Sequence, residues 1–340
     1  MSIQFLHRMH GPESYPHAAA ERAPAVLATW LHYSPDSIPA DRDFEDWAEN
    51  AIMLHFAHQR YGHVELLPNP KGILVSGDRT SFVPPQPGKP RAFMYGMWKP
   101  SDSLDFLSTY NMAGNDADSV RTVAAYPLSP VFRSAAGREF HVVDADRQQI
   151  ETVLQHMHSA GHRRVFIKTR FKGVAGTFDM PDQALDLWDT ISRDTPLEWL
   201  LVQHEGAAGV LFIQEAFEPR KEYRTIIVRD RVVTGAGCIE SFTPLGNRGT
   251  KFDNRMEDIR NQSQPAPEPD LLERYIEFAE TFARRWADEH GDQMIYSLDL
   301  AVDARTGNIL PIEMNPMTNL GLYASNANSL VAAIANGFSE

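Results

Sequence analysis

Three oxygen-bearing side chains, Asp299, Glu313 and Asn315, lie in two short apolar segments near the carboxyl end of the chain. Residues 295–302 and 308–314 have strand-like composition, and the polar segment between them has turn chemistry, so we predict a β-hairpin. Side chains alternate between the faces of a strand. In one register of the hairpin, in which the numbers of each pair of opposite residues add up to 612, Asp299 lies opposite Glu313. A β-bulge at Gly307 would set this register.

Two facing carboxylates repel each other by about 1 kcal/mol at ~4 Å in water, and by about 4 kcal/mol at an effective dielectric constant near 20. A fold that tolerates such a pair usually supplies a cation. Because the three side chains offer oxygen ligands and neither sulfur nor imidazole, they favour Mg²⁺. The alternative is a surface hairpin whose acids are solvated.

The composition is that of a globular protein with an acidic balance. The chain has 340 residues, 43% of them hydrophobic and 23% charged, which favours two domains or one domain with a large lobe. A net charge of −13 opposes attraction to nucleic acid and to anionic membranes. The sequence contains no 18-residue apolar run, its start lacks a signal-peptide core, and its single cysteine, Cys238, fits a reducing compartment. We therefore expect a cytoplasmic protein without a nucleic-acid or membrane partner.

Helical periodicity is clear in residues 43–61, 146–160 and 270–289, and further helices are expected near 182–192 and at 327–335. The apolar stripe of the first helix would consist of Phe44, Trp47, Ala51, Leu54 and either Ala57 or His58. Two groups of neighbouring histidines lack the spacing of a metal site and do not favour one: His55, His58 and His63, and His156, His158 and His162.

Residues 165–168 are predicted to form a strand that runs into a glycine-containing loop at 169–177. Glycines allow backbone N–H groups to approach phosphate oxygens, and Lys168 and Lys172 add positive charge. The segment matches neither a P-loop nor a dinucleotide fingerprint. It is therefore either a phosphate-binding loop or an ordinary basic turn.

A buried strand at 210–213 is predicted to end in residues 214–219, and a second hairpin follows at 222–239. Glu222 and Arg224 fall on one face of that hairpin, where they could form a plain surface ion pair worth under about 1 kcal/mol. Residues 246–252 form a polar loop that could reach over a site.

Taken in order, these signals resemble the ATP-grasp family over residues 130–338. The resemblance implies an α+β fold in which two α+β lobes clasp ATP, with an additional N-terminal α/β domain. The implied boundaries are 1–125 for the N-terminal domain, 126–212 for the first lobe and 213–340 for the second lobe with the metal site.

The resemblance also assigns roles to residues. The implied ATP-binding residues are Arg133, Lys168, Lys172, Gly173, Gly176, Gln214, Glu215, Ala216, Phe217 and Glu222, with Glu215 meeting the adenine amino group and Glu222 the ribose. The implied magnesium ligands are Asp299, Glu313 and Asn315, and Thr318 and Asn319 would face the acceptor substrate.

Several motifs look most like the branch of the family that has one arginine and two lysines at the nucleotide site, here Arg133, Lys168 and Lys172. Many ATP-grasp ligases carry an arginine where this chain has Ser297 or Met317. Charge on the reacting acyl phosphate must then be neutralised from elsewhere, and Arg224, Lys251 and Arg248 are the candidates.

The function implied is that of an ATP- and Mg²⁺-dependent carboxylate–amine ligase acting on small molecules or peptides. A substrate carboxylate would attack the γ-phosphate, and an amine would then displace phosphate from the acyl phosphate. Two alternatives stay open: an ATP-grasp kinase that phosphorylates a hydroxyl, and a nucleotide-binding module without turnover. The identity of the substrates and the oligomeric state are not predicted.

Overall fold

The computed structural model describes Gly114 and residues 116–144, 146–169, 175–180, 210–237, 242–247, 249–258, 263–317 and 320–338, together with five N-terminal strands and part of the segment between 49 and 60. The chain divides into two compact units. Unit 1 contains residues 1–124, 219–302 and 311–340, and unit 2 contains residues 125–218 and 303–310. Each unit is described separately below.

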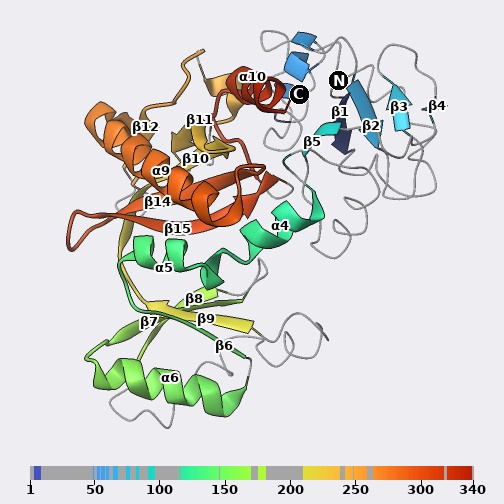
Figure 1. The fold of residues 1–340 in the computed structure, drawn as a ribbon. Helices are drawn as coiled ribbons and strands as arrows, with labels where there is room; N and C mark the ends of the chain where they lie inside the picture. Colours follow the sequence, from blue (N-terminus) through green and yellow to red (C-terminus); the bar gives the residue numbers. More distant parts are fainter. Residues whose placement is uncertain are drawn as a thin grey trace. The chain divides into compact units, whose positions relative to one another are not determined.

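Unit 2 is built on a four-stranded antiparallel sheet, with strand order β6-β9-β7-β8 (Figure 1). The strands are β6 (Phe140–Asp144), β7 (Arg164–Thr169), β8 (Ala175–Asp179) and β9 (Val210–Glu215). Helix α6 (Arg147–Ser159) begins at Asp146, whose carboxylate accepts a hydrogen bond from the Gln149 N–H. Its buried residues Ile150, Leu154 and Met157 pack on the sheet, which confirms the predicted helix and its apolar side.

The short helix α5 (Pro130–Ala136) precedes β6. Ser129 caps its first turn and Pro130 occupies the first helical position, where no N–H is required. The helix ends at Gly137, whose φ of 59° is the left-handed conformation that glycine adopts without strain. It is preceded by the 3-10 turn η2 (Tyr126–Leu128).

Unit 1 contains a second four-stranded sheet, in the order β11-β10-β14-β15. The strands are β10 (Pro219–Val228), β11 (Arg231–Gly237), β14 (Ile295–Asp303) and β15 (Ile309–Pro316). Helices α9 (Pro269–His290) and α10 (Ala327–Gly337) pack against β10 and β11 (Figure 1). Tyr275, Phe282 and Trp286 of α9 are buried in the core, as its 3.6-residue pattern predicts.

Both predicted hairpins are confirmed. In the first, β10 and β11 pair antiparallel around Arg229, which adopts a φ of 61°. In the second, the Asp303 N–H donates to the Asn308 carbonyl over 2.9 Å, and Gly307 supplies a φ of 72° in the turn.

The N-terminal part of unit 1 carries a mixed five-stranded sheet with the order β4-β3-β2-β1-β5. Its strands are β1 (Gln4–Arg8), β2 (Val64–Leu67), β3 (Leu74–Ser76), β4 (Phe82–Val83) and β5 (Arg91–Tyr95), and β1 is parallel to both β2 and β5. The described residues between 49 and 60 are helical, with Ile52, Met53 and Ala57 buried. Phe44, Trp47, Ala51 and Leu54 of the predicted stripe lie outside the described residues.

The predicted boundaries of the loop at 169–177 are both wrong. Thr169 belongs to β7, and residues 175–177 belong to β8. Gly176 therefore lies in a strand, opposite Ile167. Alanine and glycine give the start of this segment weak strand propensity, so its extended conformation depends on pairing with β7. Lys172 and Gly173 lie outside the described residues, as does the helix expected near 182–192.

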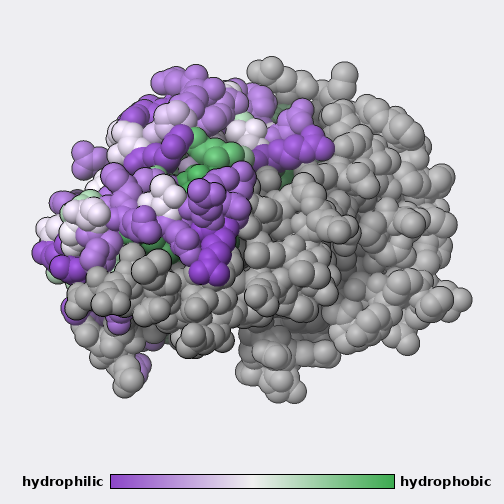
Figure 2. All heavy atoms as spheres, turned by 90° about the horizontal axis from the view of Figure 1, so that it is seen from below, coloured by the Kyte–Doolittle hydropathy of each residue, from purple (hydrophilic) through white to green (hydrophobic). Residues whose placement is uncertain are grey.

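In the described part of the chain, no helix combines the length and apolar character needed to cross a bilayer. The described surface visible in Figure 2 is mostly hydrophilic, with a small hydrophobic area. Leu128, 52% exposed, is the large hydrophobic side chain that stands out among the described residues.

Candidate active site

The three predicted metal ligands come together on neighbouring strands of unit 1. Asp299 lies on β14, and Glu313 and Asn315 lie on β15. The Asn315 amide, Nδ2, donates to Glu313 Oε1 over 3.1 Å and lies 3.4 Å from Asp299 Oδ2. Both carboxylates therefore point to the same side of the hairpin, as the two-residue period predicts.

Asp299 is 4% exposed, so the alternative of a solvated surface acid does not apply to it. Its charge is balanced by Arg224 of β10, which is also buried. Arg224 Nε donates to Oδ1 over 2.8 Å and Nη2 donates to Oδ2 over 2.7 Å, which is the bidentate geometry that guanidinium and carboxylate groups favour. Arg224, considered above for a plain surface ion pair with Glu222, is therefore not a surface residue but part of a buried ion pair with Asp299.

The donor set fits a small, hard divalent cation. Two carboxylates and one guanidinium leave one negative charge, and turning the Asn315 amide by 180° would place its oxygen beside both acids. Ser297, two residues before Asp299, is completely buried, and its hydroxyl has no hydrogen-bond partner among the described residues. A polar group without a partner at this depth is unusual in proteins.

The chain after β15 wraps around Arg224. The Gly321 carbonyl accepts a hydrogen bond from Arg224 Nη1 over 3.1 Å, and the guanidinium lies 4.7 Å from the centre of the Tyr323 ring. The buried carboxylate of Glu49, from the N-terminal helix, accepts hydrogen bonds from the N–H groups of Leu322 and Tyr323 over 2.7 and 2.8 Å. The N-terminal part of unit 1 thus helps to position the segment that holds Arg224.

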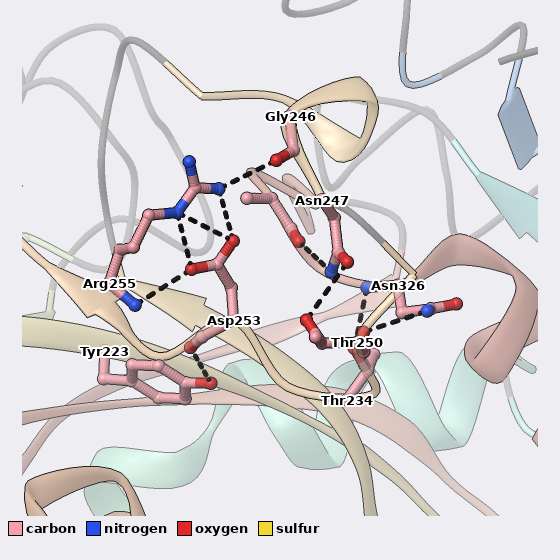
Figure 3. Close-up of polar contacts among 9 residues, drawn as sticks. Tyr223, Thr234, Gly246, Asn247, Thr250, Asp253, Arg255 and Asn326 are labelled. Carbon is pink, nitrogen blue, oxygen red and sulfur yellow. Dashed lines mark hydrogen bonds and ion pairs between the residues drawn. The ribbon is translucent and has the colours of Figure 1, made fainter. Parts of the chain in front are cut away.

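The polar loop at 246–252 is tied to its surroundings rather than projecting freely (Figure 3). Asn247 donates to the Ala324 carbonyl over 2.7 Å, and Asn326 donates to the Thr250 carbonyl over 2.9 Å. The Thr234 hydroxyl of β11 donates to the Lys251 carbonyl over 2.7 Å. These contacts fix the backbone at Lys251, a predicted catalytic residue.

The side chain of Lys251 is exposed, with Nζ 4.9 Å from the centre of the Phe252 ring. Next to this loop, Asp253 forms an ion pair with Arg255, whose Nη2 also donates to the Gly246 carbonyl over 2.9 Å (Figure 3). Hydrogen bonding to Asp253, opposed by burial, raises the pKa of Arg255 above its ordinary value. Arg248, a further candidate, lies outside the described residues.

Replacing Gly235 by alanine is expected to destabilise the protein by about 1–3 kcal/mol. A Cβ atom at this position of β11 would lie 2.7 Å from the Arg224 carbonyl oxygen and 2.7 Å from the Tyr223 ring, so the strands next to the site would have to separate. Urea denaturation would measure the loss, with Gly337→Ala in helix α10 as the control, because a Cβ there first meets the flexible side chain of Arg229, at 3.3 Å. Equal stability in both variants would contradict the expected close contact.

Unit 2 holds the described residues predicted to bind ATP, apart from Glu222 on β10. Lys168 lies half-buried on β7, with Nζ 5.4 Å from the centre of the Tyr126 ring. Arg133 is exposed on α5 and its Nη2 donates to the Leu128 carbonyl over 2.8 Å. Unit 2 thus contains two of the three cationic side chains, Arg133 and Lys168, that are predicted to bind the phosphates of ATP.

The predicted adenine hinge, residues 214–217, begins in the last two residues of β9, and its groups already contact neighbouring residues. Glu215 Oε1 accepts a hydrogen bond from Arg305 Nη2 over 3.2 Å, and the Ala216 N–H donates to the Arg164 carbonyl over 3.2 Å. Gln214 is buried, and its side-chain oxygen accepts a hydrogen bond from Arg138 Nε over 2.8 Å.

Arg138 was not predicted from the sequence. Its guanidinium lies 4.7 Å from the centre of the Phe217 ring. Burial lowers the pKa of Arg138 to about 10, with Tyr126 and Glu215 acting in the opposite direction, so the group stays cationic at neutral pH. In the sequence, Arg138 could have been noticed because it directly follows Gly137, the glycine at which α5 ends before the chain enters β6.

Thr318 and Asn319, the predicted substrate residues, lie outside the described part of the chain. The segment they belong to is fixed at both sides, by Met317, which is completely buried, and by Gly321 against Arg224.

Comparisons with known proteins show the fold. No protein-family model matches the sequence, and no curated protein matches it. D-alanyl-alanine synthetase A from Vibrio cholerae has a similar solved structure, with a TM-score of 0.53, 13% sequence identity, and 100% of this chain and 99% of that chain covered. D-alanine-D-alanine ligase from Coxiella burnetii gives a TM-score of 0.52 at 12% identity, with 99% and 95% covered. The predicted ATP-grasp α+β fold is confirmed.

Proposed function

We propose that this chain is an ATP-dependent carboxylate–amine ligase that works through an acyl phosphate and releases ADP and phosphate. The observation that carries the proposal is the grouping of Asp299, Glu313 and Asn315 in a fold whose nucleotide chemistry requires a divalent cation. The two similar structures are both of enzymes named as a synthetase or ligase of alanine residues, which supports the joining of a carboxylate to an amine.

Asp299, Glu313 and Asn315 would hold Mg²⁺, which when bound neutralises phosphate charge. Arg224 has two roles in the proposal. It balances Asp299 before the cation binds, and it places positive charge where the acyl phosphate develops, in place of the arginines missing at Ser297 and Met317. Lys251, on its fixed backbone, would supply a second positive charge.

The nucleotide would be held mainly by residues of unit 2. In this proposal the phosphates contact Arg133, Lys168, Lys172, Gly173 and Gly176, which follows the family branch with one arginine and two lysines. The adenine contacts Gln214, Glu215, Ala216 and Phe217, and Glu222 of unit 1 takes the ribose. Glu215 would have to exchange Arg305 for the adenine amino group, since both use its carboxylate.

Thr318 and Asn319 would contact the acceptor substrate, a small molecule or a peptide. The division into an N-terminal domain (1–125), a first lobe (126–212) and a second lobe (213–340) is part of the same proposal. The two hydrogen bonds that the Glu49 carboxylate accepts from the segment after β15 support a role for the N-terminal domain in shaping the substrate site.

A second candidate is a nucleotide-binding module without turnover. The residues at the two positions where many ligases have arginine favour this alternative. They are Ser297 and Met317, which are both completely buried and carry no charge. Arg224 is already committed to Asp299. In this alternative ATP and Mg²⁺ bind and no ADP forms.

Trapping with hydroxylamine tests the proposal. The purified chain is incubated with ATP, Mg²⁺, hydroxylamine and a panel of amino acids and short peptides, and both ADP and hydroxamates are measured. A ligase gives ADP together with a hydroxamate, because hydroxylamine intercepts the acyl phosphate. ADP with a phosphorylated hydroxyl compound and no hydroxamate would identify a kinase, and nucleotide binding without ADP would favour the binding module.

Replacing Lys168 by alanine is expected to weaken ATP binding about tenfold, which corresponds to about 1.4 kcal/mol, because a half-buried ammonium group near the phosphates is lost. Isothermal titration with a non-hydrolysable ATP analogue and Mg²⁺ would measure the change. Arg164→Ala is the control, since it removes a cation from the same strand that pairs instead with Asp179. Unchanged affinity in Lys168→Ala would move the phosphate site elsewhere.

A further inference from the structure

Glu139 of unit 2 is surrounded by three histidines. His141 of β6 has its Nε2 atom 2.7 Å from Glu139 Oε1, and His156, from the last turn of α6, has its Nε2 atom 3.2 Å from the same oxygen. One ligand atom from each of Glu139, His141 and His156 lies within 4.8 Å of the others. His162, in the turn before β7, contacts the second oxygen of Glu139 over 2.7 Å.

We propose that Glu139, His141 and His156 form a binding site for Zn²⁺ or a chemically similar divalent transition-metal ion. Two imidazole nitrogens and one carboxylate oxygen are a ligand set that Zn²⁺ takes in proteins, with a water molecule in the fourth position. The set differs in kind from the oxygen-only group of Asp299, Glu313 and Asn315, so the two groups select different ions.

The elements that carry the ligands are held by the core of unit 2. His141 is paired with Ile213 of β9 in the sheet, and His156 directly precedes Met157, which is completely buried against that sheet. The three ligand atoms are therefore brought together by packing that does not depend on an ion. The side chain of His156 is 65% exposed, which leaves room for solvent on that side of the site.

His162 is a positioning residue in this proposal. Its Nε2 atom contacts Glu139 Oε2, and its Nδ1 atom lies 3.8 Å from Glu215 Oε1. Such contacts orient a carboxylate ligand and are typical of metal sites in proteins.

The spacing of His156, His158 and His162 gave no reason to expect a metal site, and the structure shows why this group of three is not the relevant one. His158 contacts Arg163 instead, with 3.0 Å between its Nε2 atom and Arg163 Nη1. Glu139 and His141, which complete the cluster, lie 15 or more residues earlier in the chain, directly before β6 and within it.

The experiment measures Zn²⁺ binding to the full chain without a histidine tag, by competition with a chromophoric chelator in excess Mg²⁺. We expect one Zn²⁺ site per chain that His156→Ala weakens by about tenfold to a hundredfold, and that Glu139→Gln also weakens. His162→Ala is expected to weaken it by about tenfold. His158→Ala is the control from the same exposed turn of α6 and should leave the affinity unchanged.

Absorption of the Co²⁺-substituted chain provides a second readout, since its visible bands report nitrogen and oxygen ligands directly and should change in His156→Ala but not in His158→Ala. Melting curves recorded with chelator present verify that the variants are folded. Zn²⁺ affinity that is unchanged in both His156→Ala and Glu139→Gln, or reduced equally by His156→Ala and His158→Ala, would overturn the proposal. If Zn²⁺ instead bound at Cys238, its affinity would be unchanged in both His156→Ala and Glu139→Gln.

Discussion

Replacing Glu313 by glutamine is expected to reduce ADP formation about a thousandfold while leaving the folded protein nearly as stable as the wild type. Glutamine keeps the volume of the side chain and an oxygen that can accept the Asn315 hydrogen bond, which spans 3.1 Å in the wild type. It removes one of the two negative charges available to Mg²⁺. Loss of several kcal/mol of charge stabilisation corresponds to a rate decrease of this size.

Two measurements separate this effect from misfolding. ADP release is followed with a substrate identified by the hydroxylamine screen, and thermal unfolding is compared with and without Mg²⁺ and an ATP analogue. The wild type should gain stability from the ligands, whereas Glu313→Gln should gain much less. Glu277→Gln, at an exposed position of α9, is the control for the chemical change. Full activity in Glu313→Gln would refute the metal assignment.

The hairpin at 295–316 could be predicted because its information is local. Apolar residues alternate with Asp299, Glu313 and Asn315, a turn separates the strands, and a two-residue period is enough to place the three polar side chains on one side. Helix α9 could be predicted for the same reason, since one stripe of its surface carries most of its apolar residues.

The surroundings of the hairpin could not be predicted in this way. Arg224 meets Asp299 across 75 residues of chain, and the contact depends on which strands are neighbours in the sheet and on their register, which local patterns do not specify. Glu49 accepts a hydrogen bond from the N–H of Leu322, which lies 273 residues later in the chain. This contact could not be predicted, because an acidic residue in an amphipathic helix is ordinarily assigned to the side that faces solvent. Strand β8 was missed because pairing with β7, rather than its own composition, makes it extended.

Replacing Arg224 by methionine is expected to lower the free energy of unfolding by about 3–5 kcal/mol in the absence of divalent cations. The side chains of Arg224 and Asp299 are 4% and 6% exposed, so the change would leave a buried carboxylate without its counter-charge. Methionine retains most of the apolar volume, which limits the contribution of lost packing. Urea denaturation measures the loss.

Two comparisons test whether the missing charge is the cause. The double variant Arg224→Met/Asp299→Leu removes both charges and should recover much of the lost stability, because a buried ion pair can be replaced by apolar residues at little cost. Arg229→Met removes an arginine from the other end of the β10–β11 hairpin, where its pair with Asp292 is 33% and 40% exposed, and should cost much less. If Arg224→Met costs no more than Arg229→Met, the pair with Asp299 is not what stabilises this part of unit 1. If the cost is as expected, and Mg²⁺ reduces it in Arg224→Met but not in the double variant, then Mg²⁺ and Arg224 neutralise the same carboxylate.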